Sequence, residues 1–225
     1  MPDGGLPLAI KWEGFFHDMN FRDVGASLNN CLNSRFFQEG LILRSAGWFS
    51  GWDCDKVGNP DIIYSLNFSP DRAERYFCQS DKQKRIGYYF NFETGLADLE
   101  FLESWDDSET KTAACLFLKD IIVSVLEDKK TLVHCDAGRD RTGAIAAILV
   151  ALVAESVNKL DSRMITAIEC DYQKTQSLEV EKQGRMRRFI AEIVRQGGMS
   201  QFISSQCNVS PEVITLYAEK MLVGF

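Results

Sequence analysis

One short segment of the chain combines a thiol, a glycine and two arginines at a spacing that suits chemistry on a phosphate group. It reads VHCDAGRDRTG over residues 133–143, between an apolar stretch typical of a strand and one typical of a buried helix. A cysteine at the end of a strand that faces a helix N-terminus meets unpaired backbone N–H groups and the positive end of the helix dipole. Both favour the thiolate, which is the nucleophilic form of cysteine. Cys135 is therefore a candidate nucleophile.

The residues around Cys135 are suited to hold an anion above its sulfur. Gly138 lets the backbone curl so that successive N–H groups converge on one anion. The Arg141 guanidinium can bind two phosphate oxygens at once. Thr142 can donate its hydroxyl to the sulfur, and His134 can hydrogen-bond the backbone behind it. We expect the phosphate to lie among Asp136, Ala137, Gly138, Arg139, Arg141 and Thr142. A Walker-type nucleotide loop is excluded, because no GxxxxGK[ST] string occurs.

The alternative for any free cysteine is a small buried core residue, and this is our interpretation of the six cysteines other than Cys135. For Cys135 the strand, glycine, arginine, hydroxyl and apolar helix all occur in the order that a phosphate-binding loop needs. The functional interpretation is therefore favoured at this position.

Attack of a thiolate on a phosphate ester also needs a proton donor for the leaving oxygen, and later a base for water. One candidate is Asp140, inside the segment and next to Arg141. The other is an acidic stretch ahead of a predicted helix, which contains Asp98, Asp106 and Asp107. The alternative for Asp140 is a carboxylate that only orients Arg141. The alternative for Asp98, Asp106 and Asp107 is that they belong to a solvated loop and provide a charge at a helix N-terminus.

Length and composition are those of one ordinary folded domain. The chain has 225 residues, of which 45% are hydrophobic and 25% charged, and we predict a single domain over 1–225 with an N-terminal extension over 1–18. The formal net charge of -7 argues against nucleic acid and anionic membrane surfaces as partners. Only His17 and His134 occur, which excludes a multi-histidine metal site. We expect no metal and no other cofactor.

Seven cysteines are present, an odd number, and none forms a CxxC pair. This pattern argues against a zinc knuckle or a disulfide framework and favours a reducing compartment. The longest apolar run, over residues 143–154, is shorter than the roughly 20 residues of a bilayer span. No targeting segment is recognisable at the start. We therefore expect a cytoplasmic protein without a transmembrane segment.

Hydrophobic periodicity and capping residues divide the chain into strands that alternate with helices, followed by a helical tail. This order predicts an α/β fold with helices on the faces of a sheet. Strands are predicted over 41–45, 61–67, 85–92 and 131–135, and helices over 70–79, 108–128, 143–154, 161–175, 178–195 and 211–222.

The segment HCDAGRDRTG (134–143) resembles the HCxxGxxR[ST] signature of cysteine-dependent protein tyrosine phosphatases. MNFRDVG (19–25) and LILRSA (41–46) resemble two elements of one branch, the atypical microbial tyrosine and lipid phosphatases. That branch usually carries HCxAGKDRTG. IECDYQKTQ (168–176) and the tail over 202–222 are similar to its later helices. The resemblance therefore spans roughly residues 19–222, in the signature and four other separate elements.

The resemblance implies a three-layer phosphatase fold around a mostly parallel sheet. It also implies metal-independent hydrolysis of phosphomonoesters through a cysteinyl-phosphate, with Cys135 as nucleophile, Arg141 on the phosphate and Asp140 as acid. The flap with Asp98, Asp106 and Asp107 resembles instead the separate aspartate loop of ordinary tyrosine phosphatases. The implied substrate is phosphotyrosine in proteins, with dual specificity for phosphoserine and phosphothreonine in some members. The alternatives are a phosphoinositide phosphatase and a catalytically silent phosphate-binding relative.

Several positions depart from the family or have a supporting role. Arg139 replaces the usual lysine, and Asp136 places a carboxylate at the rim that should disfavour highly anionic substrates. We expect Arg22 and Asp23 to pair with each other under the loop. Arg44 is expected either to contact a second phosphate or to form a buried ion pair. The basic run over 185–188 is predicted to be a solvated helix face.

Overall fold

The strand that leads to Cys135, β5 (Thr131–Cys135), lies in the middle of a five-stranded sheet in the computed structural model, which describes residues 20–46, 54–66, 84–87, 99–135, 137–175 and 180–224. β5 pairs in parallel with its two neighbours, and all its residues are buried. β4 is parallel to β3, whereas β1 is antiparallel to β2. The strand order is β1 (Arg22–Asp23), β2 (Ile42–Ala46), β5, β3 (Ile62–Ser65) and β4 (Lys84–Gly87).

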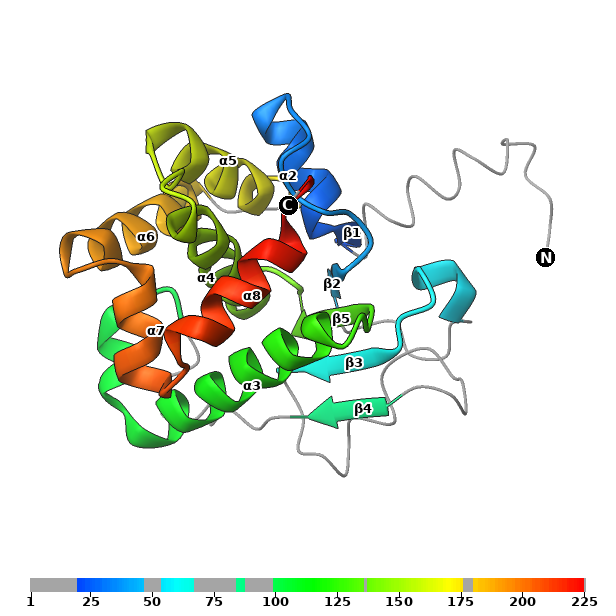
Figure 1. Ribbon diagram of the computed structural model, residues 1–225, viewed down its shortest axis with the longest axis horizontal. Helices are drawn as coiled ribbons and strands as arrows, with labels where there is room; N and C mark the ends of the chain where they lie inside the picture. The colour runs from blue at the N-terminus through cyan, green and yellow to red at the C-terminus, as the bar shows by residue number, and fades with distance from the viewer. Residues whose placement is uncertain are drawn as a thin grey trace.

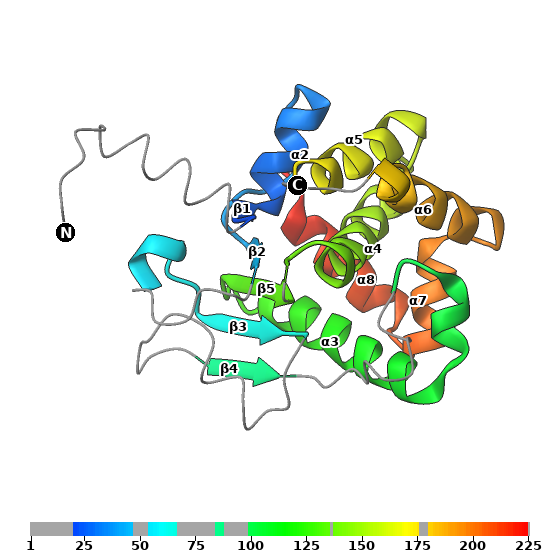
Figure 2. The same cartoon turned by 180° about the vertical axis from the view of Figure 1, so that it is seen from behind.

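The helix after β5, α4 (Asp140–Ser156), is enclosed by other helices. Every residue from Arg141 to Ala154 is buried, which confirms the predicted buried helix and extends its start by three residues. It contacts the helices of the C-terminal part, which Figure 1 and, from behind, Figure 2 show gathered on the side of the molecule away from β3 and β4. These are α5 (Ser162–Gln173), α6 (Arg185–Arg195), α7 (Met199–Cys207) and α8 (Pro211–Met221).

The remaining long helix, α3 (Ser108–Leu126), contacts β5, α7 and α8. It starts where the sequence predicts, and its N-cap is Asp107. The strands predicted over 41–45, 61–67 and 131–135 are confirmed to within two residues. The third predicted strand begins at Lys84, and its part over 88–92 lies outside the described residues, as does the predicted helix over 70–79.

The single helix predicted over 178–195 is wrong. The chain forms a short 3-10 turn, η5 (Val180–Lys182), and a separate helix α6 that begins at Arg185. Gly184 lies between them with a φ of 78°, in the left-handed region that interrupts a helix. The break matters for the site, because it brings Lys182 out of the helix.

A helix that the sequence pattern did not indicate, α2 (Val24–Leu32), follows β1. Its N-cap is Asp23, which accepts a hydrogen bond from Ala26 N (2.8 Å). A Cβ on Gly25 would lie 2.2 Å from the Gln38 carbonyl oxygen, so this helix packs directly against neighbouring backbone. Asn29 is buried and bonds to the backbone of Phe36 and Phe37. Polar residues on the buried face remove the apolar periodicity by which a helix is recognised.

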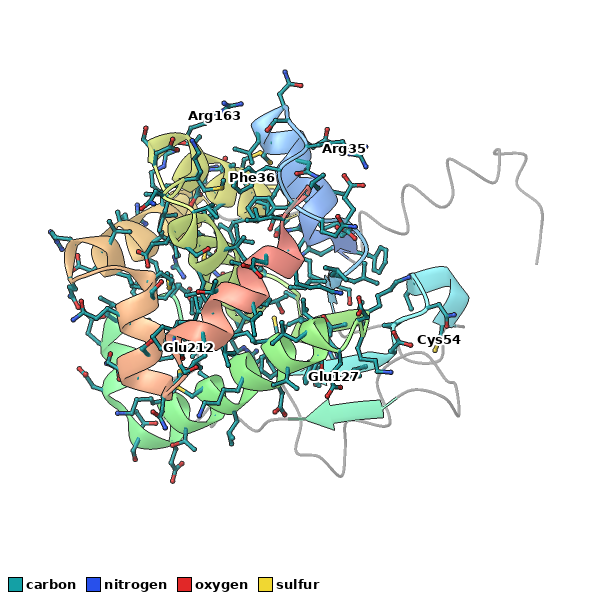
Figure 3. All side chains as sticks on the ribbon, in the orientation of Figure 1. Arg35, Phe36, Cys54, Glu127, Arg163 and Glu212 are labelled. Carbon is teal, nitrogen blue, oxygen red and sulfur yellow. A yellow bond between two sulfur atoms is a disulfide. The ribbon has the colours of Figure 1, made fainter. Side chains whose placement is uncertain are left out.

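Two disulfides contradict the prediction that the chain has no disulfide framework. Cys31–Cys170 joins α2 to α5, and Cys115–Cys207 joins α3 to α7. Cys54, labelled in Figure 3 on the 3-10 turn η1 (Cys54–Val57), is disulfide-bonded as well. The partners are 139 and 92 residues apart in sequence, so spacing alone could not reveal them. The argument for a reducing compartment therefore loses its basis. Within the described residues, no helix has both the length and the apolar character needed to cross a bilayer.

Candidate active site

Cys135 is placed where the sequence predicts, at the end of β5 and just before α4. It is 3% exposed and is the one free cysteine among those that the structure describes. The neighbouring parallel strands end beside it, with Ala46 paired to Cys135 and Ser65 paired to His134. The carboxyl ends of parallel strands are where open α/β sheets bind ligands. The loop from Cys135 to Asp140 thus lies between this edge and the positive end of the α4 dipole.

The backbone of this loop is held from behind. Gly138 has a φ of 63°, and a Cβ there would lie 2.2 Å from the Ser45 carbonyl oxygen, so only glycine fits. The Asn20 amide donates to the carbonyls of Ala137 (3.2 Å) and Gly138 (2.7 Å). Arg44 Nη2 donates to the Gly138 carbonyl as well (2.8 Å). The loop is therefore fixed by contacts to its carbonyls. Asp136 lies outside the described residues.

A buried charge cluster lies behind these contacts. Asp171 accepts from Arg22 Nε (2.7 Å), Arg44 Nη1 (2.5 Å) and Ser27 Oγ (2.6 Å). Burial alone would raise the pKa of Asp171, but the charges of Arg22 and Arg44 hold it well below its ordinary value of 3.8. Burial and the nearby Arg22 lower the pKa of Arg44 to about 10, so it stays cationic at neutral pH.

This cluster corrects one expectation and bears on another. Arg22 was expected to pair with Asp23, but it pairs with Asp171, while Asp23 caps α2 and accepts from Gly40 N (2.5 Å). The reason is that both side chains have nearer partners once α5 packs against α2. Arg44 is 1% exposed and forms the buried ion pair that was one of its two expected roles.

The residues on either side of the loop differ in their charge and contacts. His134 is fully buried, and burial lowers its pKa to about 4, so the imidazole is neutral at pH 7. Its Nδ1 lies 3.4 Å from the Cys135 carbonyl oxygen. Arg141 is 9% exposed and donates to the Leu66 carbonyl (3.2 Å). The Thr142 hydroxyl is buried without a hydrogen-bond partner among the described residues, so its expected bond to the sulfur is not made here.

Asp140, the first residue of α4, accepts three hydrogen bonds. Its Oδ1 accepts from the Tyr172 hydroxyl (2.6 Å), and its Oδ2 from Lys182 Nζ (3.0 Å) and Arg139 Nε (3.0 Å). Burial raises the pKa of Asp140, but these hydrogen bonds and the charge of Arg139 lower it by more, to below the ordinary 3.8. In the unliganded site Asp140 is therefore a carboxylate, and Arg139 is paired with it.

The three rival aspartates have other surroundings. Asp107 is the N-cap of α3 and accepts from Thr110 N (2.7 Å), which lowers its pKa. This is the helix-terminal charge that was the alternative interpretation. Asp106 is exposed at the end of the 3-10 turn η4 (Leu102–Asp106), and Asp98 lies outside the described residues.

Sequence reasoning missed three residues at this site. Asn20 lies within the NFRD element that carried the resemblance, so the motif could have identified it. Lys182 carries no recognisable signal, because it is 42 residues from Asp140 in sequence. Arg185 was assigned to a solvated face, but it pairs with the buried Glu100 (2.9 Å) and lies over the Phe101 ring. The assignment was wrong because charge spacing cannot reveal a buried partner from a distant segment.

Comparison with known proteins adds one finding. The family model described as "Tyrosine phosphatase family" matches residues 108–223. The matched stretch begins with α3 and contains β5, the loop and helices α4 to α8. Asn20, Arg22 and Arg44, which hold the loop and its charge cluster, precede it. No curated protein matches the chain.

Proposed function

Because the chain belongs to the tyrosine phosphatase family and is thus a phosphoric monoester hydrolase, we propose that it dephosphorylates phosphotyrosine in proteins through a cysteinyl-phosphate on Cys135. The proposal includes a three-layer phosphatase fold and a single domain. It assigns the phosphate to Arg141 and the loop N–H groups, and the leaving-group proton to Asp140.

The observation that carries this proposal is the braced loop between β5 and α4. Cys135 stands at one end and Arg141 at the other, and Asn20 and Arg44 hold the carbonyls of the loop from behind. Because the loop carbonyls accept these hydrogen bonds on one side, the loop N–H groups are available for an anion on the other. Such preorganised donors stabilise charge that develops in a transition state.

The reaction has two steps. The Cys135 thiolate attacks phosphorus in line, so a P–S bond forms while the P–O bond to the tyrosine oxygen breaks, and Asp140 gives that oxygen a proton. Water then attacks phosphorus with Asp140 as base, the P–S bond breaks, and inorganic phosphate leaves. Arg141 donates hydrogen bonds to the phosphoryl oxygens in both steps, because its planar guanidinium can bind two of these oxygens at once.

Asp140 must be protonated when the ester binds, although it is a carboxylate in the unliganded site. A phosphate dianion beside a carboxylate disfavours the carboxylate charge and raises its pKa. Arg139 and Lys182, the two cations on Oδ2, are also attracted to the incoming dianion. Both effects drive Asp140 towards the protonated form when substrate is bound.

The choice of phosphotyrosine over a phosphoinositide rests on the use of the nearby cations. Arg44, which could have met a second phosphate, is committed to Asp171 and to the loop. Asp136 adds a carboxylate next to the nucleophile. These features favour a substrate with one phosphate group.

Leaving-group chemistry tests the proposal. Nitrophenolate, whose conjugate acid has a pKa near 7, leaves with little help, whereas the phenol of tyrosine, near 10, needs a proton. Asp140→Asn should therefore slow hydrolysis of a phosphotyrosine peptide by roughly 10²–10⁴-fold and of nitrophenyl phosphate far less. Equal losses on both substrates would remove Asp140 from the acid role. Matched Asp106→Asn and Asp107→Asn variants should show no leaving-group dependence.

Two further measurements separate the alternatives. Cys135→Ser should abolish turnover but still bind inorganic phosphate, because the loop and Arg141 remain. A wild-type protein that binds phosphate but turns over no ester would be a silent phosphate-binding relative. Faster turnover of phosphoinositide than of phosphotyrosine peptides, compared by kcat/KM, would contradict the substrate assignment.

A further inference from the structure

The two oxygens of Asp140 are held by different kinds of donor. Oδ1 accepts from the neutral hydroxyl of Tyr172 on α5, and Oδ2 accepts from the cations Lys182, on η5, and Arg139. The side chains of Asp140 and Lys182 are only 18% and 15% exposed, so water screens their ion pair less than a surface pair. The charged and titratable groups that surround Asp140 are Arg139, Tyr172, Lys182, Arg185 and, next to Tyr172, Glu100.

The neutral and cationic donors respond differently to an incoming phosphate. Burial and the nearby Asp140 raise the pKa of Tyr172 far above its ordinary value, so it remains an uncharged donor and keeps its hydrogen bond to Oδ1. Lys182 carries its ammonium on a flexible stem of four carbons, and a dianion attracts it more strongly than one carboxylate does. Oδ2 is therefore the oxygen that loses its partners when the ester binds.

We propose that Lys182 is a positioning residue that controls the proton on Asp140, holding Oδ2 ionised in the unliganded site and moving its contact to the bound phosphate. Tyr172 keeps the carboxyl group in place, Oδ2 takes a proton from solvent, and that O–H bond breaks as the proton passes to the leaving tyrosine oxygen. This inference rests on the proposed acid role of Asp140. It gives a function to the break before α6, which brings Lys182 to the active site.

Lys182→Met should change the pH dependence in a definite direction. The Lys182 hydrogen bond lowers the pKa of Asp140 in the free enzyme, so its loss should raise that pKa. More Asp140 is then protonated at a given pH, and the basic limb of the kcat/KM profile should move by the same amount towards higher pH. KM for the phosphotyrosine peptide should rise several-fold, because the contact to the phosphate is lost. Lys182→Arg should restore both values.

A direct titration distinguishes this inference from the proposed function. The ¹³C carboxyl resonance of Asp140, assigned by its disappearance in Asp140→Asn, can be followed against pH without turnover. In the wild type, inorganic phosphate should raise the Asp140 midpoint, and in Lys182→Met the midpoint should start higher and rise less. Lys220→Met, which removes a lysine on α8 that is paired with Asp128, is the matched control and should titrate as the wild type does.

Each outcome decides one question. The same Asp140 midpoint in Lys182→Met and wild type, with or without phosphate, would overturn the role of Lys182, whatever the activity. A midpoint that shifts as expected, combined with equal losses of Asp140→Asn on both leaving groups, would support the Lys182–Asp140 coupling and reject Asp140 as the acid. The inference would also be overturned if Lys182→Arg did not restore the pH profile of kcat/KM. A positive charge at this position would then not be enough to control the protonation of Asp140.

Discussion

Asp171→Asn removes the carboxylate that lies between the buried Arg44 and the partly buried Arg22. The side chains of Arg22 and Arg44 are 12% and 1% exposed, and that of Asp171 is 6% exposed. Asparagine has the same shape but replaces one of the two accepting oxygens with an NH2 group, so the change removes the charge together with one acceptor. Without it, Arg22 and Arg44 are left as two like charges with little water around them, and Arg44 loses a partner that orients it towards the Gly138 carbonyl.

Removal of one partner from a buried ion pair typically costs about 3–5 kcal/mol, because the remaining charge is uncompensated. For a protein of this size, 1 kcal/mol corresponds to about 2–4 °C, so Tm should fall by roughly 6–20 °C. The pKa of Asp171 is lower in the folded state than in the unfolded chain, so its contribution is present above about pH 4 and is lost as pH falls further. The difference between wild type and variant should therefore shrink below pH 4.

The assay is urea unfolding followed by tryptophan fluorescence at pH 7 and at pH 3.5, with nitrophenyl phosphate turnover measured on the same samples. Asp128→Asn is the control, because Asp128 is 74% exposed in its pair with Lys220 and should cost less than 1 kcal/mol. If Asp171→Asn changed the free energy of unfolding by less than 1 kcal/mol at pH 7, the cluster would not be the electrostatic support described above.

Four other changes give separate tests. Arg141→Lys should lower kcat by about 10²–10³-fold, since the two-pronged contact to the phosphate is lost, whereas Arg139→Lys should change steady-state rates only modestly. Gly138→Ala should abolish inorganic phosphate binding in calorimetry, while Gly40→Ala, also at positive φ but with open space around its Cβ, should bind normally. The pKa of His134 is about 4 in the folded protein and about 6.5 in the unfolded chain, so the unfolded chain takes up the imidazole proton at a higher pH. The free energy of unfolding should therefore fall as pH drops from about 6.5 to 4. In urea titrations of His134→Asn, this pH dependence should be absent. Reduction of the two described disulfides should lower Tm. Each bridge closes a long loop and so restricts the unfolded chain, which adds about 4–5 kcal/mol to the free energy of unfolding.

The elements that the sequence predicts are those in which one face or the whole element is apolar. β5 and α4 are buried almost throughout, so their hydrophobic runs identified them and located Cys135 between them. α2 was missed because its buried face carries Ser27 and Asn29. The break at Gly184 was missed because the flanking residues favour a helix, and only the left-handed backbone reveals the interruption.

The site could be predicted as far as it is local in sequence. Residues 134–142 follow one another, so their spacing alone indicated a nucleophile and an anion-binding loop. The partners that hold them come from distant segments: Asn20 is more than 110 residues from the loop, and Asp171 is 127 residues from Arg44. Such contacts depend on how α2 and α5 pack, which neither periodicity nor spacing can show. The disulfides were mispredicted for the same reason.

The two described disulfides also determine what a cut in the backbone can do. Cys31–Cys170 and Cys115–Cys207 close overlapping rings, so a single peptide bond cleaved anywhere between residues 31 and 207 leaves both fragments joined by at least one bridge. The phosphate loop lies within residues 115–170, which both rings enclose. A protease that nicks the chain would therefore yield a two-chain protein that migrates as one species on a non-reducing gel and separates only after reduction. Its active-site segment would stay tied to both ends of the fold.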